Sequence, residues 1–200
     1  MRIIPTEIPE VYLLELQIYR DERGFFTETY CKRKFEAGGI AVPHTGYAVP
    51  MGCAVDFVQD NYSGSHQGVL RGLHYQLHQA QGKLVLVVVG EIYDVAVDVR
   101  KNSPTFGKWV GTRLTANKQQ LSRHAGLWVP AGFAHGFYVL SEWAEVYYKA
   151  TDYYAPEWER TIRWDDPAVG ITWPFLDGVK PCLSEKDANA PLLKDAEVYE

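Results

Sequence analysis

The feature that most constrains this chain is a series of short β-type stretches separated by turn residues, with no long segment of helical periodicity in its middle. Gly, Pro, Asn and Asp residues, which favour turns, lie between these stretches. Many short strands are typical of a sandwich, a barrel or a jelly roll, so we predict an all-β fold. The clearest predicted strands are 11–18, 56–62, 83–89, 91–99, 126–129, 136–140 and 144–150.

The stretch EIYDVAVDVR, residues 91–100, shows the clearest alternation of side chains. Neighbouring residues of a strand point to opposite faces, so one face carries valines and the other carries two acids. We expect the valine face to be the core face. The two sets are Tyr93, Val95, Val97 and Val99 on the core face, and Ile92, Asp94, Ala96 and Asp98 on the other.

Helices are predicted only near the ends of the chain. One is expected over 32–37, and another begins near Ser184, where Ser-Glu-Lys-Asp forms a capping box. The stretch 38–54 is rich in Gly, Pro and Ala and is expected to be an irregular loop. The 200 residues show no repeat or shift in composition, so we expect one domain over 1–200, long enough to bury a sizeable core.

The charge balance excludes some classes of partner. The chain has 20 Lys and Arg residues and 25 Asp and Glu residues, a formal net charge of −5, without a block of like charges. This pattern lacks the basic footprint of a protein that binds nucleic acid or an anionic membrane. An anionic ligand must therefore be held by a few placed residues.

Nothing in the apolar pattern predicts a membrane span. The longest wholly apolar run, 84–89, is far shorter than the roughly 20 residues that a membrane helix needs. The first residues include Pro5, Glu7, Pro9 and Glu10, where a secretory signal needs an unbroken apolar segment. We therefore expect a cytoplasmic protein.

The cysteines agree with a reducing compartment. Cys31, Cys53 and Cys182 are odd in number and widely spaced, so they predict neither a disulfide framework nor a CxxC metal site. We expect free thiols.

A metal site is the first chemical candidate, because WVPAGFAH, which ends at His135, resembles half of a metal-binding cupin motif. The other half, an HxH pair and a following Glu, is missing: His74 and His78 are separated by three residues, and the next Glu is Glu91. Positions four apart on one strand lie roughly 13 Å apart, too far to hold one ion through bonds of about 2.1 Å. We predict no metal.

Acid and base chemistry is the second candidate. Arg71 offers a forked donor suited to phosphate, Lys83 a point charge, and His74 a group that exchanges a proton near neutral pH. Together they suit an anionic substrate and an enolate. Taken alone, each residue more often has a structural role: a surface salt bridge for Arg71, a satisfied polar residue for His74 and a strand edge for Lys83.

Several long blocks of the sequence resemble the dTDP-4-dehydrorhamnose 3,5-epimerase family, in the right order and over nearly the whole chain. The resemblance implies a cupin-type jelly roll that forms a homodimer and uses neither a metal nor an organic cofactor. The all-β prediction agrees with it independently. The blocks are FVQDNYSGSHQGVLRGLHYQ, QGKLVLVVVGEIYDVAVDVRKNSPTFGKWVG, WVPAGFAHGFYVLSEWAEVYYKATDYYAPEWE and WDDPAVGITWPFLDGVKPCLSEKDANAPLL.

The family inverts C3 and C5 of dTDP-4-dehydro-6-deoxy-D-glucose, giving dTDP-4-dehydro-L-rhamnose on the route to dTDP-L-rhamnose. Both carbons are adjacent to the C4 ketone, so loss of a proton from either places charge on the C4 oxygen, where a cation stabilises it. A base on one face of the sugar and an acid on the other then invert the carbon.

The resemblance assigns four catalytic positions. His74 in RGLHYQ matches the base, and Asp187 in LSEKD matches the carboxylate that pairs with it. Tyr148 matches the acid, and its neighbour Tyr147 points the other way on a regular strand. Lys83 matches the residue that stabilises the enolate oxygen.

Substrate-binding positions follow in the same way. The resemblance implies that Arg71 binds diphosphate and that Tyr154 stacks on thymine, a contact that contributes about 1–3 kcal/mol per base in single-stranded nucleic-acid complexes. Arg23 and Glu28 match residues that reach the nucleotide in the partner subunit's site. The remaining binding positions are Gln59, Asp60, Asn61, His135, Glu159 and Lys186.

The spacing of Arg71 and His74 predicts a local irregularity. Residues three apart on a regular strand point to opposite faces, yet both are expected at one site. Gly72, which lies between them, is suited to a bulge or twist that redirects one side chain.

Two departures from the family pattern leave alternatives open. The loop 38–54 is longer than its family counterpart, and 121–126 carries extra residues before Trp-Val-Pro. Both bear on the sugar or nucleotide accepted. The alternatives are an epimerase that acts at one carbon of a related nucleotide sugar, a non-catalytic sugar-binding cupin and, last, a metal-dependent cupin oxygenase.

Overall fold

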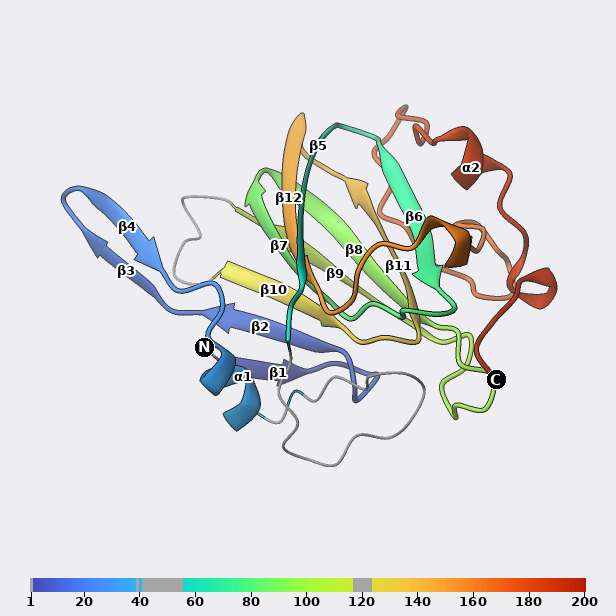
Figure 1. Cartoon of the computed structure of the whole chain (residues 1–200). Coiled ribbons are helices and arrows are strands. Elements are labelled where there is room, and N and C mark those ends of the chain that lie inside the picture. Colours follow the sequence, from blue (N-terminus) through green and yellow to red (C-terminus); the bar gives the residue numbers. More distant parts are fainter. Residues whose placement is uncertain (1, 39, 41–55, 117–123) are drawn as a thin grey trace.

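The computed structural model describes residues 2–38, 40, 56–116 and 124–200, with only the main chain described at His124 and Ala125. Two antiparallel sheets face each other, as Figure 1 shows. The first contains, in spatial order, β1 (Arg2–Pro5), β2 (Tyr12–Leu16), β10 (His124–Val129), β7 (Lys83–Val89), β12 (Trp143–Ala150) and β5 (Gln59–His66). The second contains β13 (Glu159–Thr161), β6 (Leu70–Gln76), β11 (Phe133–Val139), β8 (Glu91–Asp98) and β9 (Trp109–Thr115).

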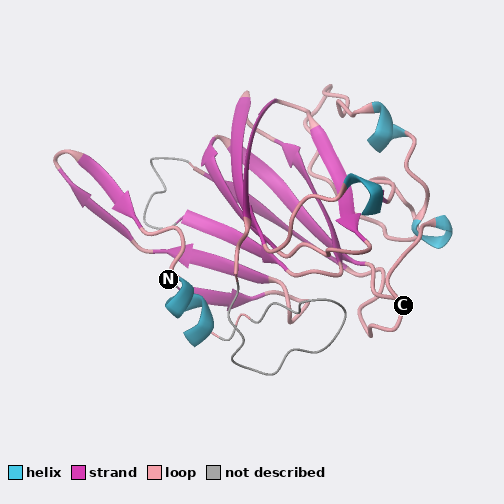
Figure 2. Ribbon diagram, in the orientation of Figure 1, coloured by secondary structure: helices cyan, strands magenta, loops and turns pink. Residues whose placement is uncertain are grey.

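Helical structure is confined to short pieces, which Figure 2 distinguishes from the strands by colour. The two α-helices agree with the predicted positions, and Ser184 caps α2 by accepting a hydrogen bond from the Asp187 main-chain nitrogen. The all-β prediction with short helices is therefore confirmed. These pieces are α1 (Lys32–Ala37), α2 (Glu185–Ala188), and the 3₁₀ turns η1 (Pro156–Trp158) and η2 (Leu193–Asp195).

The main core lies between the two sheets and draws side chains from both. A second cluster covers the other face of the five-stranded sheet, under the C-terminal segment, and a third lies between the six-stranded sheet and α1. The members of the main core include Val85, Val87, Ile92, Ala96, Leu114, Leu127, Val129, Phe137, Val139 and Val146.

Strand β8 corrects the expectation of a single core face. Val95 and Val97 pack in the second cluster, but Ile92 and Ala96 on the opposite face are also buried, in the core between the sheets. The alternation was predicted correctly, whereas the acid-bearing face is inside the molecule because β8 has packed layers on both sides. Its acids are consequently buried and need partners.

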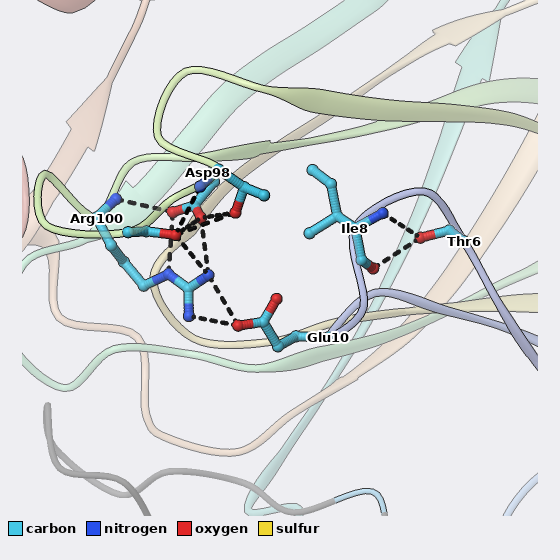
Figure 3. A network of polar contacts seen from close by, with 7 residues as sticks. Thr6, Ile8, Glu10, Asp98 and Arg100 are labelled. Carbon is cyan, nitrogen blue, oxygen red and sulfur yellow. Dashed lines mark hydrogen bonds and ion pairs between the residues drawn. The ribbon is translucent and has the colours of Figure 1, made fainter.

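Asp98 at the end of β8 obtains its partners from a polar network that Figure 3 shows. It accepts hydrogen bonds from Arg100 Nε at 2.9 Å and Nη2 at 2.7 Å, and from the hydroxyls of Ser103 and Thr105 at 2.6 Å each. Arg100 also reaches Glu10 at 3.2 Å, which connects the N-terminal segment to the turn after β8. Asp98 is thus a structural acid.

Strands β3 (Ile18–Asp21) and β4 (Gly24–Thr27) form a separate hairpin that projects away from the two sheets (Figure 1). The predicted strand 11–18 is therefore divided into β2 and the start of β3. The hairpin exposes large apolar side chains: Tyr19 is 59% exposed and Phe26 is 69% exposed.

Other predicted features lie partly outside the described residues. The loop 38–54 and the extra residues at 121–126 fall there, except Gly38, Ile40 and the last three residues of the second segment. No helix in the described part of the chain has the length and apolar character that a membrane crossing requires.

Candidate active site

A cavity of about 290 Å³ lies where the two sheets face each other, with side chains contributed by β5, β6, β7, β11 and β12. Six of the residues predicted to form the site line this cavity, and two more, Asp187 and Gln59, bond to a residue that does. The lining consists of Asn61, Tyr62, Ser63, Arg71, His74, Lys83, His135, Gly136, Phe137 and Tyr148.

His74 on β6 forms a short contact with a carboxylate from the C-terminal helix. Its Nε2 lies 2.5 Å from Asp187 Oδ1, and Asp187 is buried. Burial alone raises the pKa of Asp187, but the hydrogen bond and charge of His74, with help from Ser184, hold that pKa below its usual value. Asp187 is therefore an ionised partner that orients the imidazole ring.

His135 on β11 has a carboxylate partner of its own. Its Nε2 lies 2.7 Å from Asp94 Oδ1, and both residues are buried. The second oxygen, Asp94 Oδ2, has no hydrogen-bond partner among the described residues. The sequence analysis placed Asp94 on an acid-bearing face but missed this pairing, because its partner His135 lies 41 positions further along the chain and no local pattern links the two.

Lys83 begins β7 and points its ammonium group into the cavity, 5.9 Å from the centre of the Tyr148 ring. Burial lowers the pKa of Lys83 to about 8, although the negative charges of Glu159 and Asp94 oppose that change. The amine is therefore still mainly a cation at pH 7.

Tyr148 on β12 belongs to the opposite sheet from His74, and both line the cavity. Burial and the nearby Glu159 raise the pKa of Tyr148 above its usual value, so the phenol keeps its proton at neutral pH. Tyr147 faces away, with its hydroxyl 3.2 Å from Lys149 Nζ, as the strand alternation predicted.

The predicted irregularity between Arg71 and His74 is confirmed. The pairing of β6 with β11 shifts register around Gly136, and Gly72 has a φ of +129°. A Cβ at Gly72 would lie 2.6 Å from the Gly136 Cα, so this close approach requires glycine. As a result Arg71 and His74 line the same cavity, and Arg71 Nε donates to Ser65 Oγ at 3.0 Å.

Three other predicted residues meet beside the cavity. Glu159 Oε2 lies 2.8 Å from Lys186 Nζ and accepts a hydrogen bond of 3.2 Å from the Tyr154 hydroxyl. Burial raises the pKa of Glu159, but the Lys186 contact outweighs it and holds the pKa below its usual value. Gln59 donates to Asn61 Oδ1 at 2.9 Å and accepts from the Tyr154 main-chain nitrogen at 2.8 Å.

The remaining predicted residues lie elsewhere in this chain. The Asp60 carboxylate pairs with Lys149 at 2.6 Å, on the face that carries Tyr147. Arg23 pairs with Asp21 inside the β3–β4 hairpin, and Glu28 pairs with Lys34 at 2.7 Å. The structure therefore does not bring Arg23 or Glu28 to this chain's own cavity.

Within the described ranges, no three His, Cys, Asp or Glu side chains are grouped as metal ligands would be. The histidines of the cavity instead each contact one carboxylate.

Known proteins resemble this chain over nearly its whole length. The sequence model of the family described as dTDP-4-dehydrorhamnose 3,5-epimerase matches residues 5–195. A relative of that name from Pseudomonas aeruginosa is 52% identical over 200 residues, which cover 100% of this chain and 99% of the relative. Another from Salmonella typhimurium is 53% identical over 198 residues, covering 98% of this chain and 97% of the relative.

Solved structures show the same similarity in three dimensions. RmlC from Legionella pneumophila, a 3,5-epimerase in complex with dTDP-4-keto-L-rhamnose, has a TM-score of 0.85 and 48% identity, covering 97% of this chain and 93% of that one. A 3'-monoepimerase from Streptomyces bikiniensis in complex with dTDP-quinovose has a TM-score of 0.81 and 33% identity, covering 96% and 87%. On the family match and these identities, the chain belongs to the dTDP-4-dehydrorhamnose 3,5-epimerase family.

Proposed function

We propose that this cavity epimerises C3 and C5 of dTDP-4-dehydro-6-deoxy-D-glucose and so forms dTDP-4-dehydro-L-rhamnose. One observation carries the proposal: an imidazole paired with a carboxylate and a protonated phenol come from opposite sheets to one cavity that also holds a lysine. Inversion at carbon needs a base and an acid on opposite faces of the sugar. A site that only binds sugar does not.

In the proposed reaction His74 removes the proton from the carbon next to the C4 ketone. The electron pair of the broken C–H bond moves into the ring, and the negative charge collects on the C4 oxygen as an enolate. Asp187 holds the imidazole in place and stabilises the imidazolium that forms.

Lys83 stabilises the enolate. Its pKa of about 8 keeps it mainly cationic at pH 7, and a preformed cation beside a developing oxyanion lowers the barrier without reorganisation. Loss of the C–H proton is the step that such a charge assists.

Tyr148 then delivers its phenolic proton to the opposite face of the same carbon, which inverts it. The enolate electron pair forms the new C–H bond, and the ketone is restored. The imidazolium and the phenolate return to their starting states by exchanging protons with water, after which the second carbon reacts in the same way.

The nucleotide is bound, on this proposal, along the side of the cavity that holds Arg71 and Tyr154. Arg71 contacts the diphosphate through its forked donors, and the Tyr154 ring stacks on thymine. The Asp60 carboxylate pairs with Lys149 on the face of the sheet that points away from the cavity, so Asp60 would contact the substrate through its main chain. The other proposed binding residues are Gln59, Asn61, His135, Glu159 and Lys186.

We also propose a cytoplasmic homodimer in which the N-terminal hairpin enters the partner's site. Three features support the dimer: the hairpin projects from the sheets (Figure 1), its apolar side chains are exposed, and Arg23, between β3 and β4, does not line the cavity of its own chain. A neighbouring subunit would bury those side chains and give Arg23 and Glu28 a nucleotide to bind.

A second candidate is epimerisation at one carbon only, which the similarity to the Streptomyces bikiniensis 3'-monoepimerase favours. Both reactions use the same proton transfers, so they differ in which carbon exchanges with solvent.

Deuterium exchange separates these proposals. The purified protein is incubated with dTDP-4-dehydro-6-deoxyglucose in D₂O, and deuterium is followed at C3 and C5 by NMR, with a folded His74→Ala variant as the control. Deuterium at both carbons supports the 3,5-epimerase. Deuterium at one carbon supports the monoepimerase, and none at either means a binding protein or a different substrate.

A further inference from the structure

We propose that Gln76 is a positioning residue: its side-chain amide fixes the main chain on both sides of Tyr154 and so sets the aromatic ring that receives the nucleotide. This inference rests on the proposed function, because it assumes that Tyr154 contacts thymine. Gln76 itself does not line the cavity. Its effect on the substrate is therefore indirect, through Tyr154.

The hydrogen bonds of Gln76 carry the argument. Its Nε2 donates to the Tyr153 carbonyl at 3.2 Å and to the Gln79 carbonyl at 2.7 Å, and its Oε1 accepts from the Ala155 nitrogen at 3.0 Å. Tyr153 and Ala155 are the two neighbours of Tyr154. One side chain therefore forms hydrogen bonds with the main chain immediately before and immediately after the aromatic residue.

The polarity of these partners permits one orientation of the amide. Two carbonyl oxygens require donors and one main-chain N–H requires an acceptor, so turning the amide by 180° would break all three bonds. Gln76 is only 4% exposed, and water cannot easily replace the lost partners. This set of three hydrogen bonds consequently requires a side-chain amide, which has both donors and an acceptor.

The same strand that carries Gln76 also carries His74. Residues two apart on a strand share a face, so β6 directs His74 into the cavity and Gln76 beneath the segment that holds Tyr154. The Tyr199 hydroxyl further ties the Gln76 carbonyl to the C-terminal segment. The proposed base and the proposed nucleotide contact are thus set by neighbouring positions of one strand.

Tyr154 needs such support because its own side chain is 52% exposed. Among the described residues, its hydroxyl has one hydrogen bond, to Glu159 at 3.2 Å. Ordering a mobile aromatic residue on binding costs affinity, whereas a residue that is already held gives its stacking energy without that cost. The Gln59 contact to the Tyr154 nitrogen adds a third fixed point.

The test measures the Kd of dTDP by calorimetry and the kcat and KM of the reaction in four proteins: wild type, Gln76→Met, Tyr154→Ala and the double variant. Methionine keeps the length of the side chain and removes all three hydrogen bonds. We expect Gln76→Met to raise both Kd and KM by about tenfold, equivalent to about 1.4 kcal/mol, and to leave kcat within about twofold. In the Tyr154→Ala background it should add nothing.

A matched control is available in Gln81, whose Nε2 donates to the Asp152 carbonyl at 2.9 Å, one residue before the Gln76 contacts begin. Gln81→Met removes a similar bond from the same segment and should leave Kd, KM and kcat unchanged. An equal rise in Kd from Gln81→Met would overturn the specific role of Gln76.

Further outcomes decide the proposal. The proposal would be overturned if the losses of dTDP affinity caused by Gln76→Met and by Tyr154→Ala were fully additive in the double variant. It would also be overturned if Gln76→Met lowered kcat at unchanged Kd. If Gln76→Met does not fold, Gln76→Glu gives the same test, because it keeps an acceptor for Ala155 but loses the two donors. Wild-type protein that does not bind dTDP would contradict the proposed function itself, whereas normal wild-type binding with unchanged variants contradicts only Gln76.

Discussion

His135 lies directly opposite His74 in the pairing of β11 with β6, so two imidazole rings stand side by side on one wall of the cavity. Each ring contacts a carboxylate through Nε2, Asp187 for His74 and Asp94 for His135. The carboxylates come from different layers: Asp187 from the C-terminal helix and Asp94 from the neighbouring strand β8. The two histidines are therefore oriented independently.

Replacing Asp187 should show whether it orients His74 for catalysis or only supports the fold. Asp187→Asn removes the negative charge that orients His74 and stabilises the imidazolium, so we expect kcat to fall by about 10²–10⁴-fold with the fold retained. Glu185→Gln, on the exposed side of the same helix, is the matched control and should retain full activity. Steady-state rates and circular dichroism give the comparison, and an Asp187→Asn enzyme of normal kcat would exclude the proposed pairing.

Asp94→Asn tests the second pair. The carboxylate fixes which nitrogen of His135 carries its proton, and we expect its loss to lower kcat/KM by about 10–100-fold. If Asp94 acts through His135, the variant Asp94→Asn/His135→Gln should be no worse than His135→Gln alone. Additive losses in that double-mutant cycle would mean that Asp94 has a separate role.

The pH dependence of kcat/KM should report Lys83. Its pKa of about 8 means that the ammonium form declines above pH 8, so we expect the rate to fall there. The raised pKa of Tyr148 keeps that phenol out of this range. The Lys83→Arg variant keeps a cation at all accessible pH values, so the fall in its kcat/KM near pH 8 should disappear even if its kcat is low. A fall in kcat/KM that stays unchanged would be due to another group.

Lys83 should also reduce stability. The pKa of Lys83 is lower in the folded protein than in the unfolded chain, so the buried ammonium group destabilises the fold below pH 8. This loss of stability decreases as the pH rises from 8 to the pKa of the unfolded chain, near 10.5. We expect Lys83→Met to raise the free energy of unfolding at pH 7 by about 1 kcal/mol or more. Urea unfolding at pH 7 and pH 10 checks both claims, since the gain must shrink at the higher pH.

Subunit mixing tests the proposed hairpin exchange. One chain carries Arg23→Ala and Glu28→Ala, the other carries His74→Ala, and the two are co-expressed with different tags. If the hairpin serves the partner, each heterodimer has one complete site, and random pairing restores about a quarter of the wild-type sites. If the hairpin serves its own chain, no site is complete and the mixture stays as inactive as its parents.

Much of the sheet architecture could be predicted from the sequence, because β7, β8 and β12 are runs of β-branched and aromatic residues whose pattern is local. Strands β6 and β9 were not among the clearest predictions, since each contains a glycine and polar side chains that interrupt the alternation. The short β13 has only three residues, too few for a pattern. Its position depends on pairing with β6, which is a tertiary contact.

In the site, too, the local features could be predicted from the sequence and the long-range contacts could not. The bend at Gly72 was predictable because the spacing of Arg71 and His74 contradicts a regular strand. The contact between His74 and Asp187 joins residues 113 positions apart, and no periodicity in the sequence indicates it; only the family resemblance suggested it. Asp94 was visible as an acid on a strand, but its pairing with His135 depends on the register between β8 and β11.

The contact between Gly72 and Gly136 restricts how this cavity could be altered. A side chain at either position would meet the backbone of the other strand within 3 Å, so neither residue can be exchanged to enlarge or reshape that wall. Variation that accommodates a different sugar is therefore expected on the opposite sheet, at positions such as Asn61 and Ser63, where side chains line the cavity without such a constraint. A library randomised at those two positions should yield folded proteins far more often than one randomised at the glycines.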